Sequence, residues 1–448
     1  MKSSPDAPAS SQLWKLPAER LAAIAQAAQG MDDGAYLHWD KLRHLSPPDG
    51  LNSLEWWLGL KFKRAGSRLS FPALLANDGT ALTVSRHARL DSALARLERA
   101  LAGRVALPEA ARSESTRNQF IASSLMEEAI HSSLFEGAVS TREVAKDMLR
   151  SQRAPANRDE RMILNNYNAM LRLREMAEAP LSMETVLELH RILTEGTLDK
   201  PEEAGRLQGP GDERVNILND RLHRVVYSPP PAIQLPERMT RLVEFANADD
   251  IVDGQYVHPM LRSILLHFQL AYDHPFYDGN GRTARALFYW SMLRRGYWLA
   301  EFFSISRPLY QRRQPYKQAY LEVESDEQDG TYFALQQLSV LERAVDELYL
   351  YADRKGQAQR SLRRRLEGRG DLNHRQLALL DHALRNPDAN YTHESHANSH
   401  RMSVMSARTD LLALVERGWL SRHQSGKRLV YQPVADLETR LFTTGASR

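Results

Sequence analysis

The sequence predicts a mainly α-helical protein in which one short β-hairpin interrupts a long helical region. Apolar residues recur at the three- and four-residue spacing of helix faces in two segments: Leu261, Leu265, Phe268 and Tyr272, then Ala286, Trp290 and Leu293. Residues 214–227 instead read as two extended strands around Asn219-Asp220, a pair suited to a tight turn. Near the C-terminus, three short helical patterns precede two further strands, with a turn at Ser425-Gly426.

Composition narrows the class of protein. The chain has 448 residues with ordinary hydrophobic content, enough for several domains. Its net charge of only +3 excludes a uniform basic surface, so any nucleic-acid contact must be local. The absence of cysteine excludes disulfides, thiol nucleophiles and cysteine metal sites. No apolar signal or membrane-spanning stretch is found, so we expect a soluble, cytoplasmic protein with no membrane partner.

We expect six regions along the chain. They are a disordered N-terminus (1–11), an accessory domain (12–105), a helical domain (106–352), a charged helical linker (353–370), a compact C-terminal unit (371–435) and a tail (436–448). In the accessory domain, aromatic residues are predicted to form the core rather than a ligand cage: Trp39, Trp56, Trp57 and Phe62.

The segment HPFYDGNGRTAR, from His274 to Arg285, carries the chemistry. Its glycines, Gly279 and Gly281, flank Asn280 and let the backbone approach a ligand, and the free amides of the following first helical turn bind anions. Arg282 and Arg285 lie three residues apart and can add bidentate phosphate contacts. The segment therefore predicts a phosphate-binding loop at a helix start.

Two other side chains of this segment suit transfer of a phosphorus group. Asp278 offers the oxygen ligand that a magnesium ion bridging phosphates prefers. His274 has an ordinary pKa of about 6.5, which suits a general base at neutral pH. Two simpler interpretations remain open, an ordinary Gly-Asn-Gly turn or a zinc site. Zinc is disfavoured because the other histidines nearby show no metal spacing: His223, His258 and His267.

The complete segment resembles the signature of the Fic family, His-Pro-Phe-x-Asp-Gly-Asn-Gly-Arg-x-x-Arg, and matches it at each fixed position. The resemblance covers about residues 110–350 and implies a Fic-type helical core. Most members transfer AMP from ATP to a hydroxyl side chain of a target protein. It implies that His274 is the general base, Asp278 holds Mg²⁺, and Gly279, Asn280, Gly281, Arg282 and Arg285 bind ATP.

Relatives that catalyse other reactions limit the expectation of AMP transfer. The Doc-like kinases resemble the motif but have lysine where Gly281 stands here, and they transfer the γ-phosphate. Gly281 therefore favours AMP transfer. One member of the family transfers phosphocholine with the same motif, so the nucleotide itself is inferred.

A second motif, Ser132-Ser133-Leu134-Phe135-Glu136-Gly137, resembles the family's inhibitory signature. The resemblance implies an inhibitory helix at about residues 112–139, with Ser132 and Glu136 one helical turn apart. Glu136 would pair with Arg285 and so compete with the γ-phosphate of ATP. An ordinary surface glutamate on an amphipathic helix is the alternative.

The hairpin at 214–227 corresponds to the flap with which Fic proteins position a target by strand addition, here through Val215, Asn216 and Ile217. A plain surface hairpin is the alternative. Tyr310 and Tyr316 follow the motif helix and are candidates for stacking on adenine, although core packing explains them equally well.

Residues 371–435 are predicted to form a winged helix, whose third helix and wing carry basic residues: Arg408, Arg417, Lys427 and Arg428. Asp410 and Glu416 dilute this charge, so DNA binding competes with a role in dimerisation or target docking.

The sequence thus predicts an autoinhibited protein adenylyltransferase that uses ATP and Mg²⁺ and modifies a Ser, Thr or Tyr hydroxyl. A homodimer is a family expectation. The alternatives are a de-AMPylating enzyme that uses the same site and a nucleotide-sensing regulator that binds DNA through the winged helix.

Overall fold

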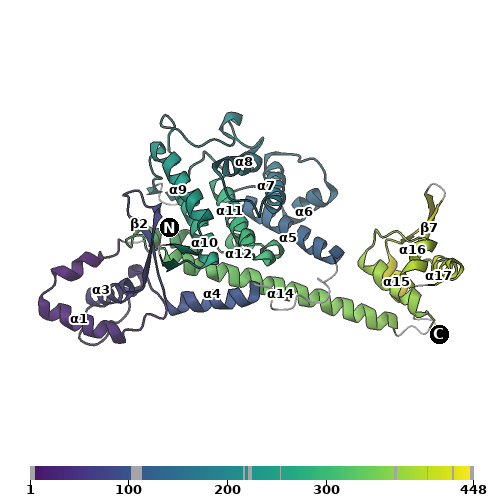
Figure 1. The fold of residues 1–448 in the computed structure, drawn as a ribbon, viewed down its shortest axis with the longest axis horizontal. Coiled ribbons are helices and arrows are strands. Elements are labelled where there is room, and N and C mark those ends of the chain that lie inside the picture. Colours follow the sequence, from purple (N-terminus) through teal and green to yellow (C-terminus); the bar gives the residue numbers. More distant parts are fainter. Residues whose placement is uncertain are drawn as a thin grey trace. The chain divides into compact units, whose positions relative to one another are not determined.

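The computed structural model describes residues 6–101, 114–214, 217–219, 224–252, 254–367, 371–400, 402–425 and 428–443. The chain divides into two compact units, Met1–Tyr351 and Ala352–Arg448. Both are dominated by helices, and the strands that the structure describes form four two-stranded antiparallel hairpins (Figure 1). In the described part of the chain, no helix combines the length and the apolar character needed to cross a membrane.

The first part of unit one is a small helical layer with one hairpin. Its elements are η1 (Ser10–Lys15), α1 (Ala18–Gly30), α2 (Trp39–Leu42), α3 (Ser53–Ala65), β1 (Arg68–Leu75), β2 (Ala81–Ser85) and α4 (Ala88–Leu101). Trp57 is fully buried at its centre, with Trp39 and Trp56 packed against the same core. Phe62 is 44% exposed and does not join that core.

Residues 7–10 differ from the expected disordered terminus. The Ala7 N–H donates to the Ser325 carbonyl at 2.8 Å, and Ser10 donates through its N–H and Oγ to Glu327 Oε1 at 3.0 and 2.8 Å. The indole of Trp57 donates to the Pro8 carbonyl at 2.9 Å. These long-range hydrogen bonds order a segment whose composition alone favours disorder.

The central helical region begins with α5 (Glu114–Phe135), α6 (Arg142–Ser151), α7 (Arg158–Glu175), α8 (Met183–Thr194), η3 (Pro201–Glu203), β3 (Ile217–Asn219), β4 (Arg224–Tyr227), η4 (Ala232–Gln234) and α9 (Leu235–Asn247). It continues with β5 (Ile251–Val252), β6 (Gln255–Tyr256), α10 (Pro259–Asp273), α11 (Asn280–Arg294), η5 (Trp298–Phe302), α12 (Ser306–Gln311), α13 (Arg313–Glu324) and α14 (Thr331–Glu367).

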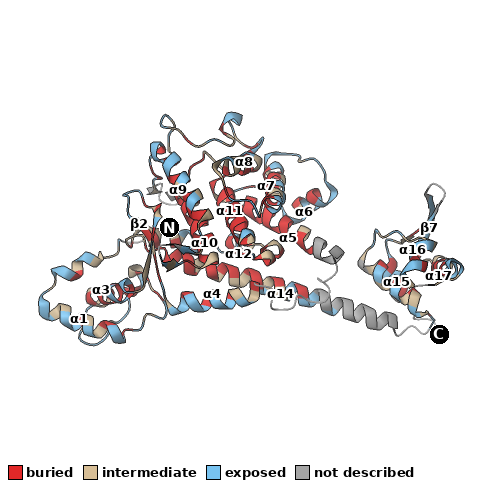
Figure 2. Cartoon of the chain, in the orientation of Figure 1, coloured by how far each residue is buried: buried red, intermediate tan, exposed pale blue. Residues whose placement is uncertain are grey.

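Helices α10 and α11 form the centre of this region. Both are buried on nearly all sides, as Figure 2 shows, and the core side chains of α11 include Leu287, Phe288 and Trp290. A helix that is buried on nearly all sides is contacted by neighbours all round. The surrounding helices therefore fix the position of the loop that joins α10 to α11.

Helix α14 runs unbroken from Thr331 to Glu367. The charged segment expected as a linker therefore continues this helix, because it contains strong helix formers and no proline.

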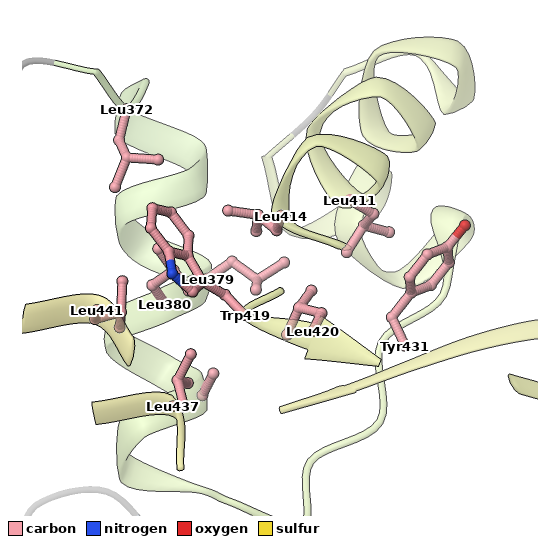
Figure 3. Packing of buried hydrophobic residues seen from close by; sticks show 11 residues of the cluster. Leu372, Leu379, Leu380, Leu411, Leu414, Trp419, Leu420, Tyr431, Leu437 and Leu441 are labelled. Carbon is pink, nitrogen blue, oxygen red and sulfur yellow. The ribbon is translucent and has the colours of Figure 1, made fainter. Parts of the chain in front are cut away.

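Unit two contains α15 (His374–Arg385), α16 (His393–His400), α17 (Val404–Glu416), β7 (Leu420–Ser425), β8 (Arg428–Pro433) and α18 (Leu437–Thr443). Strands β7 and β8 pair from Leu420 with Pro433 to Ser425 with Arg428. Helices α15 and α17 and the two strands share a leucine-rich core around Trp419 and Tyr431, shown in Figure 3. Leu437 and Leu441 of α18 also enter this core, so part of the expected tail is packed.

Candidate functional site

The loop between α10 and α11 has a defined backbone shape. His274 ends α10 in the left-handed conformation, with φ 48°, and its N–H donates to the Leu270 carbonyl at 3.0 Å. The Asn280 side chain closes the loop, accepting from the Phe276 N–H at 2.9 Å and donating to the Phe276 carbonyl at 2.8 Å. Asn280 thus shapes the loop through its side chain.

Gly279 allows the turn into α11. Its φ is +81°, a conformation that L side chains rarely adopt, and an added Cβ would lie 2.8 Å from Thr194 Cγ2. The first amides of α11 follow directly and have no partner within the helix, which is the geometry of an anion site.

His190 of α8 supports this loop, and no sequence motif pointed to it. Its imidazole is buried, stacks on Phe276 with ring centroids 3.8 Å apart, and lies 2.8 Å from the Asp278 carbonyl through Nε2. The Gly205 N–H donates to Nδ1, so Nε2 carries the proton of the neutral ring. Burial lowers the pKa of His190 to about 4. His190 therefore stays neutral and fixes the loop.

A carboxylate from the turn that follows α5 lies at the start of α11. Glu136 Oε1 is 2.9 Å from Arg285 Nη1, and a Cβ built on Gly281 would lie only 2.1 Å from the same oxygen. Ser132 binds the other edge of the guanidinium, with Oγ 2.9 Å from Nε and its carbonyl 3.1 Å from Nη2. The side chain of Arg285 is 1% exposed. The two predicted motifs therefore meet, although 153 residues separate Ser132 from Arg285.

Arg282 is occupied by other partners. Its side chain is fully buried and donates to the Leu193 carbonyl at 2.8 Å and to Asp278 Oδ2 at 3.1 Å. Asp278 also accepts from the Gly279 N–H at 2.6 Å through Oδ1. Arg282 thus connects the end of α8 to the loop, and burial lowers its pKa.

The residues present fit a magnesium ion bound together with a nucleotide. The Asp278 side chain is 47% exposed, so one hard oxygen ligand faces solvent beside the start of α11. In the described part of the chain, no group of three His, Asp or Glu side chains could hold a metal alone. Mg²⁺ often uses one or two protein carboxylates and completes its shell with phosphates and water.

His274 lies in a half-buried position beside these groups. Burial lowers its pKa, and the negative charge of Glu136 opposes that effect. Arg214 holds the backbone on either side of the α10 terminus, donating to the Asp273 carbonyl at 2.7 Å and the His274 carbonyl at 3.1 Å. The imidazole is therefore uncharged at neutral pH and can accept a proton.

The predicted flap is a hairpin of β3 and β4 in which Ile217 pairs with Tyr227. Two of the predicted flap residues, Val215 and Asn216, lie outside the described residues. So does Asp220, the second residue of the expected turn. At its base, the Tyr227 hydroxyl donates to the Tyr272 carbonyl at 2.7 Å.

The two candidate adenine residues have different surroundings. Tyr316 is buried, and its hydroxyl lies 3.1 Å from His267 Nε2 and 3.2 Å from the Tyr320 hydroxyl, so it belongs to the core. Tyr310 is 37% exposed, with its ring 5.9 Å from that of His131.

Two further residues, which the sequence did not single out, hold α5 in place. Glu128 is buried and accepts from Tyr289 Oη at 2.9 Å, Ser304 Oγ at 2.8 Å and the Ser306 N–H at 3.0 Å. Arg313 of α13 donates to the Leu134 carbonyl at 2.8 Å, two residues before Glu136. Helices α12 and α13 thus anchor the end of α5.

In unit two, the basic residues predicted to contact DNA lie in different surroundings. Arg417 pairs with Asp371 at 2.5 Å, Arg428 lies at the start of β8, and Lys427 is outside the described residues. Arg408 is exposed on α17. Asp410 of the same helix is buried and pairs with Arg375 at 2.8 Å.

Comparisons with known proteins agree on one family. Residues 180–292 match the family model described as Fic/DOC family. Over 117 residues, the chain is 31% identical to "Protein adenylyltransferase fic-1" of Caenorhabditis elegans and to "Protein adenylyltransferase Fic" of Drosophila erecta. Each match covers 26% of this chain but only 20% and 21% of the relative, so the chain spans about one fifth of the length of these proteins.

The fold has counterparts among solved structures. A Fic family protein from Desulfovibrio desulfuricans matches with a TM-score of 0.52 and 19% identity, covering 78% of this chain and 97% of that one. A variant fragment of Fic-1 from C. elegans matches with a TM-score of 0.50 and 17% identity, covering 77% and 96%. These likenesses define a helical protein of the Fic fold. The sequence match to the Fic/DOC family covers residues 180–292, which include the motif segment.

Proposed function

We propose that the protein is an adenylyltransferase that moves AMP from ATP to a hydroxyl side chain of a target protein. One observation carries the proposal: the Glu136 carboxylate lies against Gly281 and Arg285 at the start of α11. An anionic group of the protein thus fills the place where the motif predicts phosphate. The names of the matched relatives support the same reaction.

His274 supplies the general base in this proposal. Its lowered pKa keeps the imidazole neutral, and a neutral imidazole can take the proton of an incoming hydroxyl. The hydroxyl oxygen then bonds to the α-phosphorus, the bond to the β-phosphate oxygen breaks, and pyrophosphate leaves. The amides at Gly279–Gly281 and the guanidinium of Arg285 orient the triphosphate.

Asp278 is the residue that would hold Mg²⁺. When bound, the ion neutralises phosphate charge and orients the leaving group. Arg282 keeps Asp278 in place through its contact with Oδ2. The hairpin of β3 and β4 would position the backbone of the target. The target itself would be a protein that presents a Ser, Thr or Tyr hydroxyl.

Glu136 inhibits transfer in this proposal by direct competition. While Arg285 binds Glu136 and Ser132, it has no free edge for the γ-phosphate. A charge-assisted pair contributes about 1.5–3 kcal/mol, which corresponds to roughly ten- to a hundredfold in rate. Displacement of the α5 terminus would restore the site.

The test uses the purified chain with ATP labelled at the α-phosphate and a lysate as the source of targets. Glu136→Gly should increase protein labelling roughly ten- to a hundredfold over the wild type, because Arg285 becomes free. His274→Ala in the same background should abolish labelling while nucleotide binding persists. Glu143→Gly, which removes an exposed carboxylate of α6, is the matched control and should leave labelling at the wild-type level.

Other outcomes would identify another reaction. Label transferred only from γ-labelled ATP would make the protein a kinase. Release of AMP from a labelled target by the wild type would favour the de-AMPylating alternative. Labelling that survives His274→Ala would refute the assignment of the base.

A further inference from the structure

A cavity of about 330 Å³ in unit one lies apart from the site at α11. Its walls come from residues 35–41, from α12 and α13, and from α14. None of the motif residues lines it. Two residues from other elements also line it, Arg89 of α4 and Arg312 just before α13. Within α13, Pro315, Ala319 and Glu322 face the cavity, whereas Arg313 binds the carbonyl of Leu134.

The cavity is rich in positive charge. Four cationic side chains line it, namely Lys41, Arg89, Arg312 and Arg343. Among the described residues of its lining, Glu322 is the single acid, and it pairs with Lys41 at 3.0 Å. Within the part of the chain that the structure describes, no carboxylate pairs with the three arginines. Arg89 donates to the Ala35 carbonyl at 3.1 Å and Arg343 to Ser339 Oγ at 3.5 Å, and each guanidinium has further donors that could contact an anion.

The rest of the wall is mixed, with Gln318, Gln336 and Ser339 as polar residues among apolar ones. Leu37, Pro308, Leu335 and Val340 contribute aliphatic surface. Two tyrosine rings, Tyr36 and Tyr332, complete it, and their hydroxyls are already bound to Asp329 at 2.6 Å and Asp326 at 2.8 Å. The rings therefore present mainly apolar surface. Small-molecule sites combine such a wall with a few placed polar groups, and the volume lies at the lower end of their range.

We propose that this cavity binds a small organic anion whose apolar body packs on the aliphatic and tyrosine wall. Its phosphate or carboxylate group contacts Arg312 and Arg343. Guanidinium groups bind both phosphate and carboxylate through paired hydrogen bonds. The experiment below therefore decides which of the two groups the cavity prefers.

The test measures binding to the full chain by calorimetry and ligand-observed NMR. The probes are phenyl phosphate, benzoate, inorganic phosphate and benzyl alcohol. Phenyl phosphate or benzoate should bind saturably, and whichever binds more tightly identifies the headgroup. Arg312→Ala with Arg343→Ala should weaken that binding at least about tenfold, because two charge-assisted contacts are lost.

Two controls separate the cavity from other sites. Arg285→Ala removes the arginine of the α11 site, and Arg150→Ala removes an exposed arginine of α6. Binding of the organic anion should be unchanged in both, and thermal unfolding should show that each variant is folded. The proposal is overturned if neither organic anion binds saturably, or if the double variant binds as the wild type does. Equally tight binding of benzyl alcohol or of inorganic phosphate would also overturn it.

Discussion

Single residues at the start of α11 shape the site that we propose binds phosphate. A Cβ at Gly281 would come within 2.1 Å of Glu136 Oε1, so only glycine lets an oxygen approach the backbone this closely. Arg285 is held on three sides, by Glu136, by Ser132 and by the ring of Phe135 at 5.3 Å. In the proposed mechanism, the same contacts that bury the guanidinium also withhold it from the nucleotide.

The pH dependence of transfer reports on His274. Burial lowers its pKa below the ordinary 6.5, and a base must be unprotonated to act. We therefore expect kcat/KM to be constant at neutral pH and to fall only as the pH decreases below 6.5. The measurement is the rate of AMP transfer by Glu136→Gly between pH 5 and 8 at low ATP concentration, where kcat/KM reports the free enzyme.

The charges around the imidazole of His274 determine the direction in which its pKa changes when Glu136 is removed. Glu136 favours the protonated imidazole, so its removal lowers the pKa of His274 further and moves the fall in rate to lower pH. A fall in rate that is centred above pH 7 would contradict the assignment.

At the scale of elements, α13 controls the end of α5. Arg313 donates to the Leu134 carbonyl, and its guanidinium lies 5.3 Å from the ring centroid of Phe135. These contacts place the turn that carries Glu136. The turn that we propose inhibits the site is thus held by Arg313 of α13.

Arg313→Ala should loosen this turn and increase AMP transfer by the otherwise wild-type chain about tenfold, the value of one charged hydrogen bond. Lys317→Ala removes an exposed cation from the same helix and should have no effect. In the Glu136→Gly background, Arg313→Ala should add nothing, because Arg285 is already free. An additive increase there would show that Arg313 acts on another step.

At the scale of the whole molecule, the two units have separate cores. Leu380 is fully buried in unit two beside Leu411 and Trp419, in the cluster of Figure 3. Unit two should therefore unfold as its own cooperative transition. The winged-helix assignment and DNA binding by this unit stay predictions, which a gel shift with residues 371–448 over increasing salt would test.

Leu380→Ala should lower the free energy of unfolding of unit two by about 2–5 kcal/mol, because it leaves a cavity in a packed core. Val404→Ala, at a site 53% exposed, should change it by less than about 0.5 kcal/mol. Denaturant unfolding of the full chain would measure both. AMP transfer by Glu136→Gly should be the same with and without Leu380→Ala, and a parallel loss would mean that the units depend on each other.

Local sequence patterns were sufficient to predict several elements of the fold. The apolar spacing of Leu261 to Tyr272 predicted α10, and the extended residues around Asn219 predicted the hairpin of β3 and β4. The helices and strands of unit two also follow the expected order. The predicted disorder of residues 1–11 was wrong for residues 7–10, because Ala7 and Ser10 bind partners more than 300 residues away in the chain and Pro8 accepts from Trp57.

The sequence by itself determined the loop-to-helix motif, since its glycines, asparagine and neighbouring charges act within a dozen residues. Only the tertiary structure brought Glu136 and Ser132 to Arg285, placed His190 under the loop, and turned Arg282 toward Asp278 and α8. Backbone conformation depends on adjacent residues, whereas contacts between distant segments depend on how complete helix surfaces pack. For that reason the motif is readable in the chain, whereas Ser132 and Glu136 were expected only through the family resemblance and His190 was not expected at all.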